Sequence, residues 1–392
     1  MRFVEELDVK GKRVFLRVDF NVPLTEEGEI RDDTRIRASL PTIIYLLEHG
    51  AKLVIASHLG RPKGKVDPKM SLKPAAARLA SLIPNKVTQA PDVVGTEVTR
   101  LKKELKEGEV LLLENVRFTK AETDNDEAFA RQLAEDIDVF VNDAFGSCHR
   151  AHASVVAIAR FVKEKAAGYL LKKEVDYLRK AVHDPAKPYV AILGGAKVED
   201  KIPVIENLLN KADDILIGGA MAYTFLKAQG KDVGKSLVED DKLDIARTVL
   251  KKAAEKKVNF LLPLDHVLAA EVDAGAETEV VESLPFPAGK MGVDIGPKTV
   301  AAYAKIIAGA KTIVWNGPLG VFEIDKFAKG TIGIAESVAA SGAISIVGGG
   351  DSIAAVKKAG VTDKISHIST GGGASLEFLA YETLPGIDAL EN

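Results

Sequence analysis

The chain has 392 residues, which is too many for one ordinary hydrophobic core, so two domains are expected. Its 46% hydrophobic and 28% charged residues are typical of a globular protein, and a formal net charge of −3 gives no field that would favour nucleic acid or a membrane surface. A lone cysteine, Cys148, excludes an internal disulfide and a thiolate metal cluster.

A reducing, cytoplasmic setting is the simplest expectation for a chain with so little cysteine. The first twenty residues carry acids early and lack a long apolar core, so we expect no signal peptide. No stretch approaches the ~20 apolar residues that a membrane helix needs.

Short apolar runs alternate with amphipathic segments along most of the chain. Apolar residues at helical spacing, such as Leu72, Ala76 and Leu79, predict helices between the runs. Strands and helices in alternation indicate an α/β fold with parallel sheets covered on both faces. The runs predict strands at 13–20, 52–57, 109–115, 138–145, 188–195, 213–219, 259–265, 311–317, 343–350 and 364–370.

Polar side chains follow the predicted strands of the N-terminal half. Any one of these arginines or histidines could simply be a surface or structural residue, and His149 and His152 are best explained that way. Because the ends of parallel strands meet at one edge, and because arginine binds phosphate and carboxylate through its planar fork, the set together predicts a site for a small anion. The set comprises Asp19, Asn21, Arg35, His58, Arg61, Arg117 and Arg150.

A charged amphipathic segment at 166–182 predicts a helix that connects two domains. After it, five predicted strands end in glycine-rich turns: GGAK, GGAM, NGPLG, GGGDS and TGGGAS. Glycines at strand ends let a phosphate approach the backbone N–H groups at a helix start. One such turn is weak evidence, but five indicate a nucleotide or polyphosphate site, although neither a Walker A motif nor a G-x-G-x-x-G fingerprint is present.

Three charged residues stand out in these turns. Lys197 follows the glycines of GGAK, with Lys201 one helical turn later, and this position favours a phosphate contact over a solvated surface pair. Asp351 in GGGDS could be a helix N-cap, a ligand for the Mg²⁺ that accompanies nucleotide phosphates, or both. No dedicated general base is evident, which suits phosphoryl transfer between a carboxylate and a nucleoside diphosphate, because both oxygens are already ionised.

At these residues the sequence resembles the phosphoglycerate kinase family. The resemblance runs through KRVFLRVDFNVPL, SHLGRPKG, LLLENVRF, FVNDAFGSCHRAHAS, AILGGAKVEDK, WNGPLGVFE, GGGDS and HISTGGGASLEFLAYETLPGIDAL. It implies two doubly wound, Rossmann-like domains facing a cleft, which close about the connecting helix. It also implies the reversible, Mg²⁺-dependent transfer of the 1-phosphoryl group of 1,3-bisphosphoglycerate to ADP, giving ATP and 3-phosphoglycerate, by a monomer without nucleic-acid or membrane partners.

The resemblance also implies domain boundaries and residue roles. Residues 1–167 with the tail 380–392 would bind 3-phosphoglycerate, and residues 168–379 would bind the nucleotide. Asp19 and Asn21 would contact the glycerate, His58, Arg61, Arg117 and Arg150 its 3-phosphate, and Arg35, Lys197, Gly350 and Gly373 the reacting groups. The nucleotide site would comprise Gly194, Gly195, Lys197, Lys201, Gly218, Gly219, Gly292, Val293, Asn316, Pro318, Glu323, Gly349, Gly350, Asp351, Ser352, Gly371 and Gly372, with Asp351 holding Mg²⁺.

Two positions depart from the family's usual residues. Cys148 stands where a small, alanine-like residue is usual, and Ser352 replaces a threonine but keeps its hydroxyl. Neither change touches the expected charged groups. Alternative interpretations are an acyl-phosphate-forming kinase for another small carboxylate, a nucleotide-binding sensor without turnover, and, less favoured, a dehydrogenase.

Overall fold

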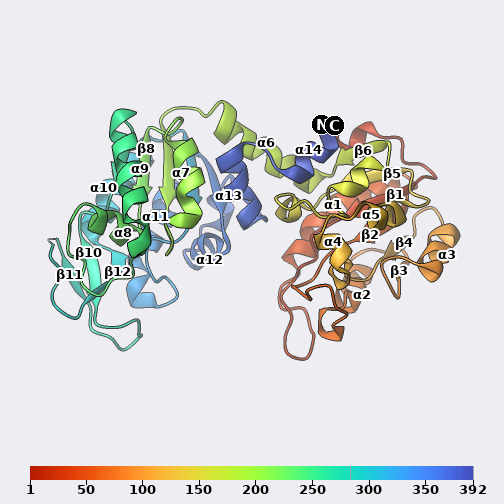
Figure 1. Cartoon of the computed structure of the whole chain (residues 1–392), viewed down its shortest axis with the longest axis horizontal. Helices are drawn as coiled ribbons and strands as arrows, with labels where there is room; N and C mark the ends of the chain where they lie inside the picture. Colours follow the sequence, from red (N-terminus) through yellow and green to blue (C-terminus); the bar gives the residue numbers. More distant parts are fainter. Residues whose placement is uncertain (283, 392) are drawn as a thin grey trace. The chain divides into compact units, whose positions relative to one another are not determined.

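The chain folds into two compact units in the computed structural model, which describes residues 1–282 and 284–391. Unit 1 comprises residues 1–176 and 383–392, and unit 2 comprises residues 177–382 (Figure 1). The chain passes from one unit to the other within α6 (Tyr169–His183), the helix that the sequence predicts at 166–182. In the part of the chain that the structure describes, no helix has both the length and the apolar character needed to cross a membrane.

Unit 1 is built on a parallel sheet of six strands in the order β3-β4-β2-β1-β5-β6. The central strands carry Val14, Leu16, Leu53 and Ile55, all fully buried, into its core. The strands are β1 (Arg13–Arg17), β2 (Lys52–Ala56), β3 (Val87–Gln89), β4 (Val110–Leu112), β5 (Val139–Asn142) and β6 (Glu164–Ala167); the helices are α1 (Thr34–Glu48), α2 (Lys73–Leu82), α3 (Thr96–Glu104), α4 (Lys120–Thr123), α5 (Glu127–Ala134) and α14 (Pro385–Glu391).

Unit 2 contains a second parallel sheet of six strands in the order β15-β14-β13-β7-β8-β9. In chain order this is the Rossmann arrangement, and the winding direction reverses between β7 and β13, where such folds bind ligands. The strands are β7 (Tyr189–Leu193), β8 (Asp214–Ile217), β9 (Asn259–Leu261), β13 (Thr312–Asn316), β14 (Ile344–Gly348) and β15 (His367–Ile368); the helices are α7 (Ile202–Leu208), α8 (Met221–Ala228), α9 (Leu243–Glu255), α10 (Pro297–Gly309), α11 (Lys329–Ala340), α12 (Gly350–Lys358) and α13 (Gly372–Tyr381).

The predicted α/β class with two parallel sheets is confirmed, with differences in detail. The predicted strands are a few residues too long, because the backbone leaves the sheet where the polar and glycine residues begin. The sequence pattern did not predict β3 and β6. It also did not predict a small antiparallel sheet in unit 2, which consists of β10 (His266–Ala269), β11 (Glu279–Val281) and β12 (Met291–Ile295). Apart from residues 267–270, which include most of β10, these segments have no continuous apolar run of four residues, and in β11 Val280 is largely exposed.

The last helix, α14, packs onto unit 1 through close backbone contact. Gly386 N donates to Cys148 O at 2.9 Å, and a Cβ at Gly386 would lie only 2.9 Å from Cys148 Cα. Ile387 and Leu390 are buried beside it, and the amino group of Met1 lies 3.6 Å from the Glu391 carboxylate. The tail of the chain therefore completes unit 1.

The start of α6 is held by two buried side chains of unit 1. Leu171 N donates to Asp143 Oδ1 at 3.0 Å, and Tyr169 N donates to Thr42 Oγ1 at 2.9 Å. The other carboxylate oxygen, Asp143 Oδ2, is buried without a hydrogen-bond partner among the described residues. Burial raises the pKa of Asp143 to about 7, so the folded chain binds a proton there more tightly than the unfolded chain does.

Replacing Asp143 by asparagine is therefore expected to alter how stability depends on pH. Between about pH 4 and 7 the wild-type carboxyl loses a proton that the folded state favours, so its contribution to stability falls as pH rises. The difference in thermal unfolding midpoint, variant minus wild type, should be larger at pH 8 than at pH 5 in calorimetry. Glu26→Gln, on an exposed loop, is the control, and an equal difference at both pH values would contradict the assignment.

Candidate active site in two parts

In unit 1 the predicted anion-binding residues follow neighbouring strands. Arg117 lies in the short 3₁₀ helix Val116–Phe118 after β4, His58 follows β2, Asp19 follows β1, and Arg150 lies beyond β5. Since these strands are adjacent and parallel in the order β4-β2-β1-β5, their carboxyl ends bring the side chains to one edge. Arg35 joins them from the first turn of α1.

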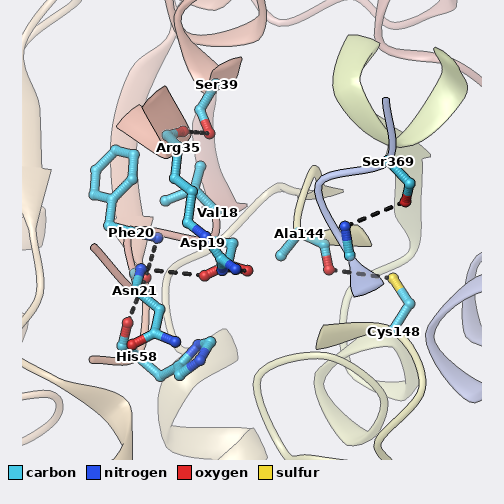
Figure 2. A network of polar contacts seen from close by, with 12 residues as sticks. Val18, Asp19, Phe20, Asn21, Arg35, Ser39, His58, Ala144, Cys148 and Ser369 are labelled. Carbon is cyan, nitrogen blue, oxygen red and sulfur yellow. Dashed lines mark hydrogen bonds and ion pairs between the residues drawn. The ribbon is translucent and has the colours of Figure 1, made fainter. Parts of the chain in front are cut away.

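Asp19 organises the middle of this edge. Its carboxylate accepts a hydrogen bond from Arg35 Nη1 at 2.5 Å and one from the backbone of Asn21 at 3.1 Å. The Asn21 side chain in turn accepts from Gly60 N at 2.8 Å. Figure 2 shows Asp19 and Arg35 meeting, with Asn21 and His58 nearby. Asp19 thus orients Arg35, and Asn21 holds the loop after β2.

The loop after β2 is also fixed from β4. The Asn115 side chain accepts from Leu59 N at 3.2 Å and donates to Leu59 O at 2.7 Å and Met70 O at 2.9 Å. Arg117 Nη1 donates to Gly60 O at 2.9 Å. His58 at the start of this loop is 5% exposed, whereas Arg61 lies exposed further along it.

Burial and neighbouring cations lower the pKa of two residues at this edge, Arg117 and His58. Burial, followed by the charges of Arg17 and Arg150, lowers the pKa of Arg117 to about 10. The pKa of His58 falls well below its usual value through burial and then the charge of Arg17. Such shifts mark positive charge that the nearby acids do not fully offset, so a bound anion would be stabilised here. Arg150 is exposed, with its Nε donating to His149 Nε2 at 3.0 Å.

In unit 2 the glycine turns after β7 and β13 lie against each other, at the place where the winding direction of the sheet reverses. Gly194 N donates to Asn316 O at 3.0 Å, and Gly195 N donates to Pro318 O at 2.8 Å. A Cβ on Gly194 would lie 2.1 Å from Pro318 O, so only glycine fits. Gly219, after β8, joins them by donating to Leu319 O at 2.9 Å.

A largely apolar cavity of about 310 Å³ opens beside these turns. Its size and lining suit the base and ribose of a nucleotide. Of the predicted residues it is lined by Gly195, Gly219, Gly292, Val293, Pro318, Glu323 and Asp351. The prediction missed most of its apolar wall, which includes Tyr223, Leu237, Val272, Met291 and Leu319.

A second cavity, of about 530 Å³, shares Gly195, Pro318 and Asp351 with the first. It is lined by most of the charged and glycine residues that were predicted for the nucleotide site, and the exposed Lys197 lies on its rim. Two predicted residues line neither cavity: Gly218 packs against Leu319, and Gly371 is the N-cap of α13. The predicted residues that line it are Gly194, Gly195, Lys197, Lys201, Asn316, Pro318, Gly349, Gly350, Asp351, Ser352, Gly372 and Gly373.

Two helices begin at this second cavity. The first turn of α12 starts at Gly350 and that of α13 at Gly372, and a Cβ on Gly372 would lie 3.1 Å from Gly349 Cα. Gly349 has a φ of +93°, which favours glycine. The unpaired N–H groups and the dipoles of both helix starts can therefore stabilise negative charge in one place.

Polar side chains brace these helix starts. Lys201 Nζ donates to Asn316 Oδ1, and Asn316 Nδ2 donates to Gly348 O at 3.0 Å. Gly317 N donates to the buried Ser352 Oγ at 2.6 Å. Burial lowers the pKa of Lys201, against the opposing charges of Asp200 and Asp351. The Ser352 hydroxyl, a group that the family's usual threonine also has, thus positions the turn after β13.

Sequence reasoning also missed polar residues that lie beneath the unit 1 edge. Arg17 and Glu122 are fully buried, and Ser154 lies between them with hydrogen bonds to both. A signal for Arg17 was available, because an arginine inside the apolar strand RVFLRVDF must be paired when it is buried. No comparable pattern marked Glu122 or Ser154.

Comparisons with known proteins agree with this geometry. The family model "Phosphoglycerate kinase" matches residues 4–382. The phosphoglycerate kinases of Acidobacterium capsulatum and Anaeromyxobacter dehalogenans are 61% and 58% identical to the chain, covering 99% and 100% of it and 98% and 99% of the relatives. The solved phosphoglycerate kinase of Coxiella burnetii superposes with a TM-score of 0.91 at 44% identity, over 99% of this chain and 98% of the other. The chain therefore belongs to the phosphoglycerate kinase family, the glycolytic phosphotransferases with a carboxyl group as acceptor.

Proposed function

We propose that unit 1 binds 3-phosphoglycerate or 1,3-bisphosphoglycerate and that unit 2 binds ADP or ATP with Mg²⁺. The chain then transfers the 1-phosphoryl group reversibly between the glycerate carboxylate and the nucleotide. The observation that carries the proposal is the pair of anion sites: a cationic edge with depressed pKa values in unit 1, and two helix starts beside a nucleotide-sized cavity in unit 2.

The unit 1 residues have distinct roles in this proposal. His58, Arg61, Arg117 and Arg150 hold the 3-phosphate, and Asp19 and Asn21 contact the glycerate. Arg35, oriented by its 2.5 Å contact with Asp19, serves the carboxyl group that reacts. Asp19 also keeps Arg35 in place. The positions of these side chains in the fold therefore determine how the substrate is oriented.

The unit 2 residues handle the nucleotide and the migrating charge. The apolar cavity takes the base and ribose, and Lys201 and Asn316 contact phosphate. Lys197 and the backbone N–H groups of Gly350, Gly372 and Gly373 stabilise the charge of the transferring phosphoryl group. Because carboxylate and diphosphate oxygens are already ionised near neutral pH, no residue has to remove a proton.

Asp351 is the residue that would hold Mg²⁺. Its carboxylate is exposed where the two cavities adjoin, and among the described residues no cluster of three His, Cys, Asp or Glu side chains could hold a metal by itself. A single carboxylate fits Mg²⁺ that takes its remaining ligands from nucleotide phosphates and water. When bound, the metal neutralises phosphate charge.

The proposed setting is cytoplasmic and monomeric, without nucleic-acid or membrane partners. The small net charge of −3 supports the absence of nucleic-acid and membrane partners, and the lone cysteine supports the cytoplasmic setting. The monomer is what the resemblance implies. Analytical ultracentrifugation of the purified chain tests the monomer directly.

The decisive experiment is ATP-dependent acyl-phosphate formation from 3-phosphoglycerate, followed through a coupled reductase with chelator and no-substrate controls. We expect robust Mg²⁺-dependent turnover, and little with glycerate or other carboxylates that lack a phosphate. Equal turnover of unphosphorylated carboxylates would instead indicate a different acyl-phosphate-forming kinase. Nucleotide binding without any turnover would indicate a sensor.

Replacing Asp351 by asparagine is expected to raise the Mg²⁺ concentration for half-maximal activity roughly tenfold or more, since a neutral amide binds the ion more weakly than a carboxylate. The measurement is initial rate against free Mg²⁺ at fixed nucleotide. Asp363→Asn removes an equal charge from an exposed position on the same unit and is the matched control. An unchanged Mg²⁺ dependence in the Asp351 variant would show that the ion is held elsewhere.

A further inference from the structure

The buried Arg17 touches His58 from beneath the unit 1 edge. Arg17 is the last residue of β1 and is fully buried. Its Nε donates to Ser154 Oγ at 2.7 Å, its Nη1 donates to Val18 O, and its Nη2 lies 3.3 Å from His58 Nδ1. The guanidinium is thus bound on three sides, one of which is the histidine ring.

These contacts determine where His58 carries its proton. A guanidinium can only donate hydrogen bonds, so His58 Nδ1 must be the acceptor and cannot hold a proton. The one ring proton then lies on Nε2, which has no hydrogen-bond partner among the residues that the structure describes. A neutral His58 with a proton on Nε2 is a hydrogen-bond donor for a ligand oxygen.

The hydrogen-bond network of Arg17 continues through Ser154 to Glu122. A serine hydroxyl has one proton, and Ser154 Oγ gives it to Glu122 Oε1 at 2.7 Å, which leaves a lone pair to accept from Arg17 Nε. Ser154 N also donates to Glu122 Oε2 at 2.9 Å. The fully buried Glu122 carboxylate offsets the Arg17 charge. Arg17, Ser154 and Glu122 therefore each have a hydrogen-bond partner within this network.

We infer that Arg17, held by Ser154 and Glu122, is a positioning residue that keeps His58 neutral with its proton on Nε2, so that His58 serves the substrate phosphate as a hydrogen-bond donor and not as a charge. The inference rests on the proposed function for the identity of that phosphate. It does not rest on it for the state of the ring, which follows from the contacts alone.

The charges that face His58 also favour its neutral form. Arg17 on β1, Arg117 after β4 and Arg35 on α1 are cations, and His152 is itself neutral because burial and Arg117 lower its pKa to about 3. These groups, together with burial, hold the pKa of His58 well below its usual value. The ring therefore stays neutral down to acidic pH, and phosphate affinity gains nothing from its protonation near pH 6.5.

The test is ¹⁵N NMR of the histidine side chains in the full chain without substrate, from pH 5.5 to 8. Long-range proton–nitrogen correlations report which ring nitrogen is protonated, and the His58→Asn spectrum assigns the resonance. We expect His58 Nε2 protonated and Nδ1 unprotonated throughout. A proton on Nδ1, or an imidazolium at neutral pH, would overturn the inference. A correct tautomer that 3-phosphoglycerate does not perturb would keep the positioning role and count against the proposed substrate.

Ser154→Ala provides a milder perturbation than removing Arg17. It frees Arg17 Nε and one Glu122 oxygen, so His58 should show mixed tautomers and a raised pKa. The KM for 3-phosphoglycerate should rise roughly 5- to 30-fold and become dependent on pH near 6.5, with kcat changed much less. Ser147→Ala is the control, because this serine of unit 1 is also buried but its hydroxyl has no partner among the described residues. Identical tautomers and pH profiles in both variants would refute the role of Ser154.

Discussion

Replacing Lys197 by alanine is expected to lower kcat by about 10²–10³-fold while the dissociation constant of the nucleotide changes by less than about threefold. Lys197 is exposed on the rim of the larger cavity, beside the two helix starts, so its ammonium group is free to follow a phosphoryl group. Lys201, in contrast, is held by Asn316 and remains to bind the nucleotide phosphates. The measurement pairs steady-state kinetics with nucleotide binding by calorimetry.

The matched control for this experiment is Lys231→Ala, an exposed lysine of the same unit that lies outside the lining of both cavities. It should leave kcat and nucleotide affinity unchanged. Equal losses of kcat and affinity in the Lys197 variant would reduce Lys197 to a binding residue. The charge stabilisation would then fall to the backbone groups of α12 and α13 alone.

Replacing Gly194 by alanine is expected to have the second large effect. The new Cβ would lie 2.1 Å from Pro318 O and 2.8 Å from Gly317 O, and both atoms belong to backbone, which cannot move aside cheaply. The turns after β7 and β13 must separate, so activity should fall about 100-fold or more. Overpacking should also lower the free energy of unfolding by about 1–3 kcal/mol.

Gly309→Ala is the control for the glycine experiment. Gly309 is an exposed residue at the end of α10, and a Cβ there would meet nothing within 4 Å. Alanine favours a helix over glycine, so this variant should be as stable as wild type or slightly more stable. If Gly194→Ala kept both its activity and its thermal unfolding midpoint, the close approach of the two turns would not be needed for nucleotide binding.

The sequence predicted where the strand-end residues lie in the fold, because their positions follow from local pattern. His58 and Asp19 come directly after apolar runs, and parallel pairing alone brings such residues to one edge. The same logic places the glycines of β7 and β13 together. The resemblance added roles for residues, such as Glu323, that no local pattern marked.

The residues that escaped prediction depend on contacts between distant segments. The apolar wall of the smaller cavity combines Tyr223 from α8 with Val272, Met291 and Leu319 from three later segments. The periodicity of any one of these segments does not indicate that they share a cavity. The antiparallel sheet of β10, β11 and β12 escaped for a similar reason, because short strands with exposed apolar residues resemble loops. Ser154 and Glu122 gain their role only by meeting Arg17 in three dimensions.

The docking of α14 on unit 1 has a consequence for the order of events during protein synthesis. Residues 383–391 belong to unit 1, where α14 packs against Cys148, yet the ribosome adds them only after all of unit 2 has been made. Unit 2 is thus an insertion within unit 1, and it can leave the exit tunnel and fold while its host still lacks a helix. The surface around Cys148 therefore stays uncovered in the nascent unit 1 until the residues of α14 have been made.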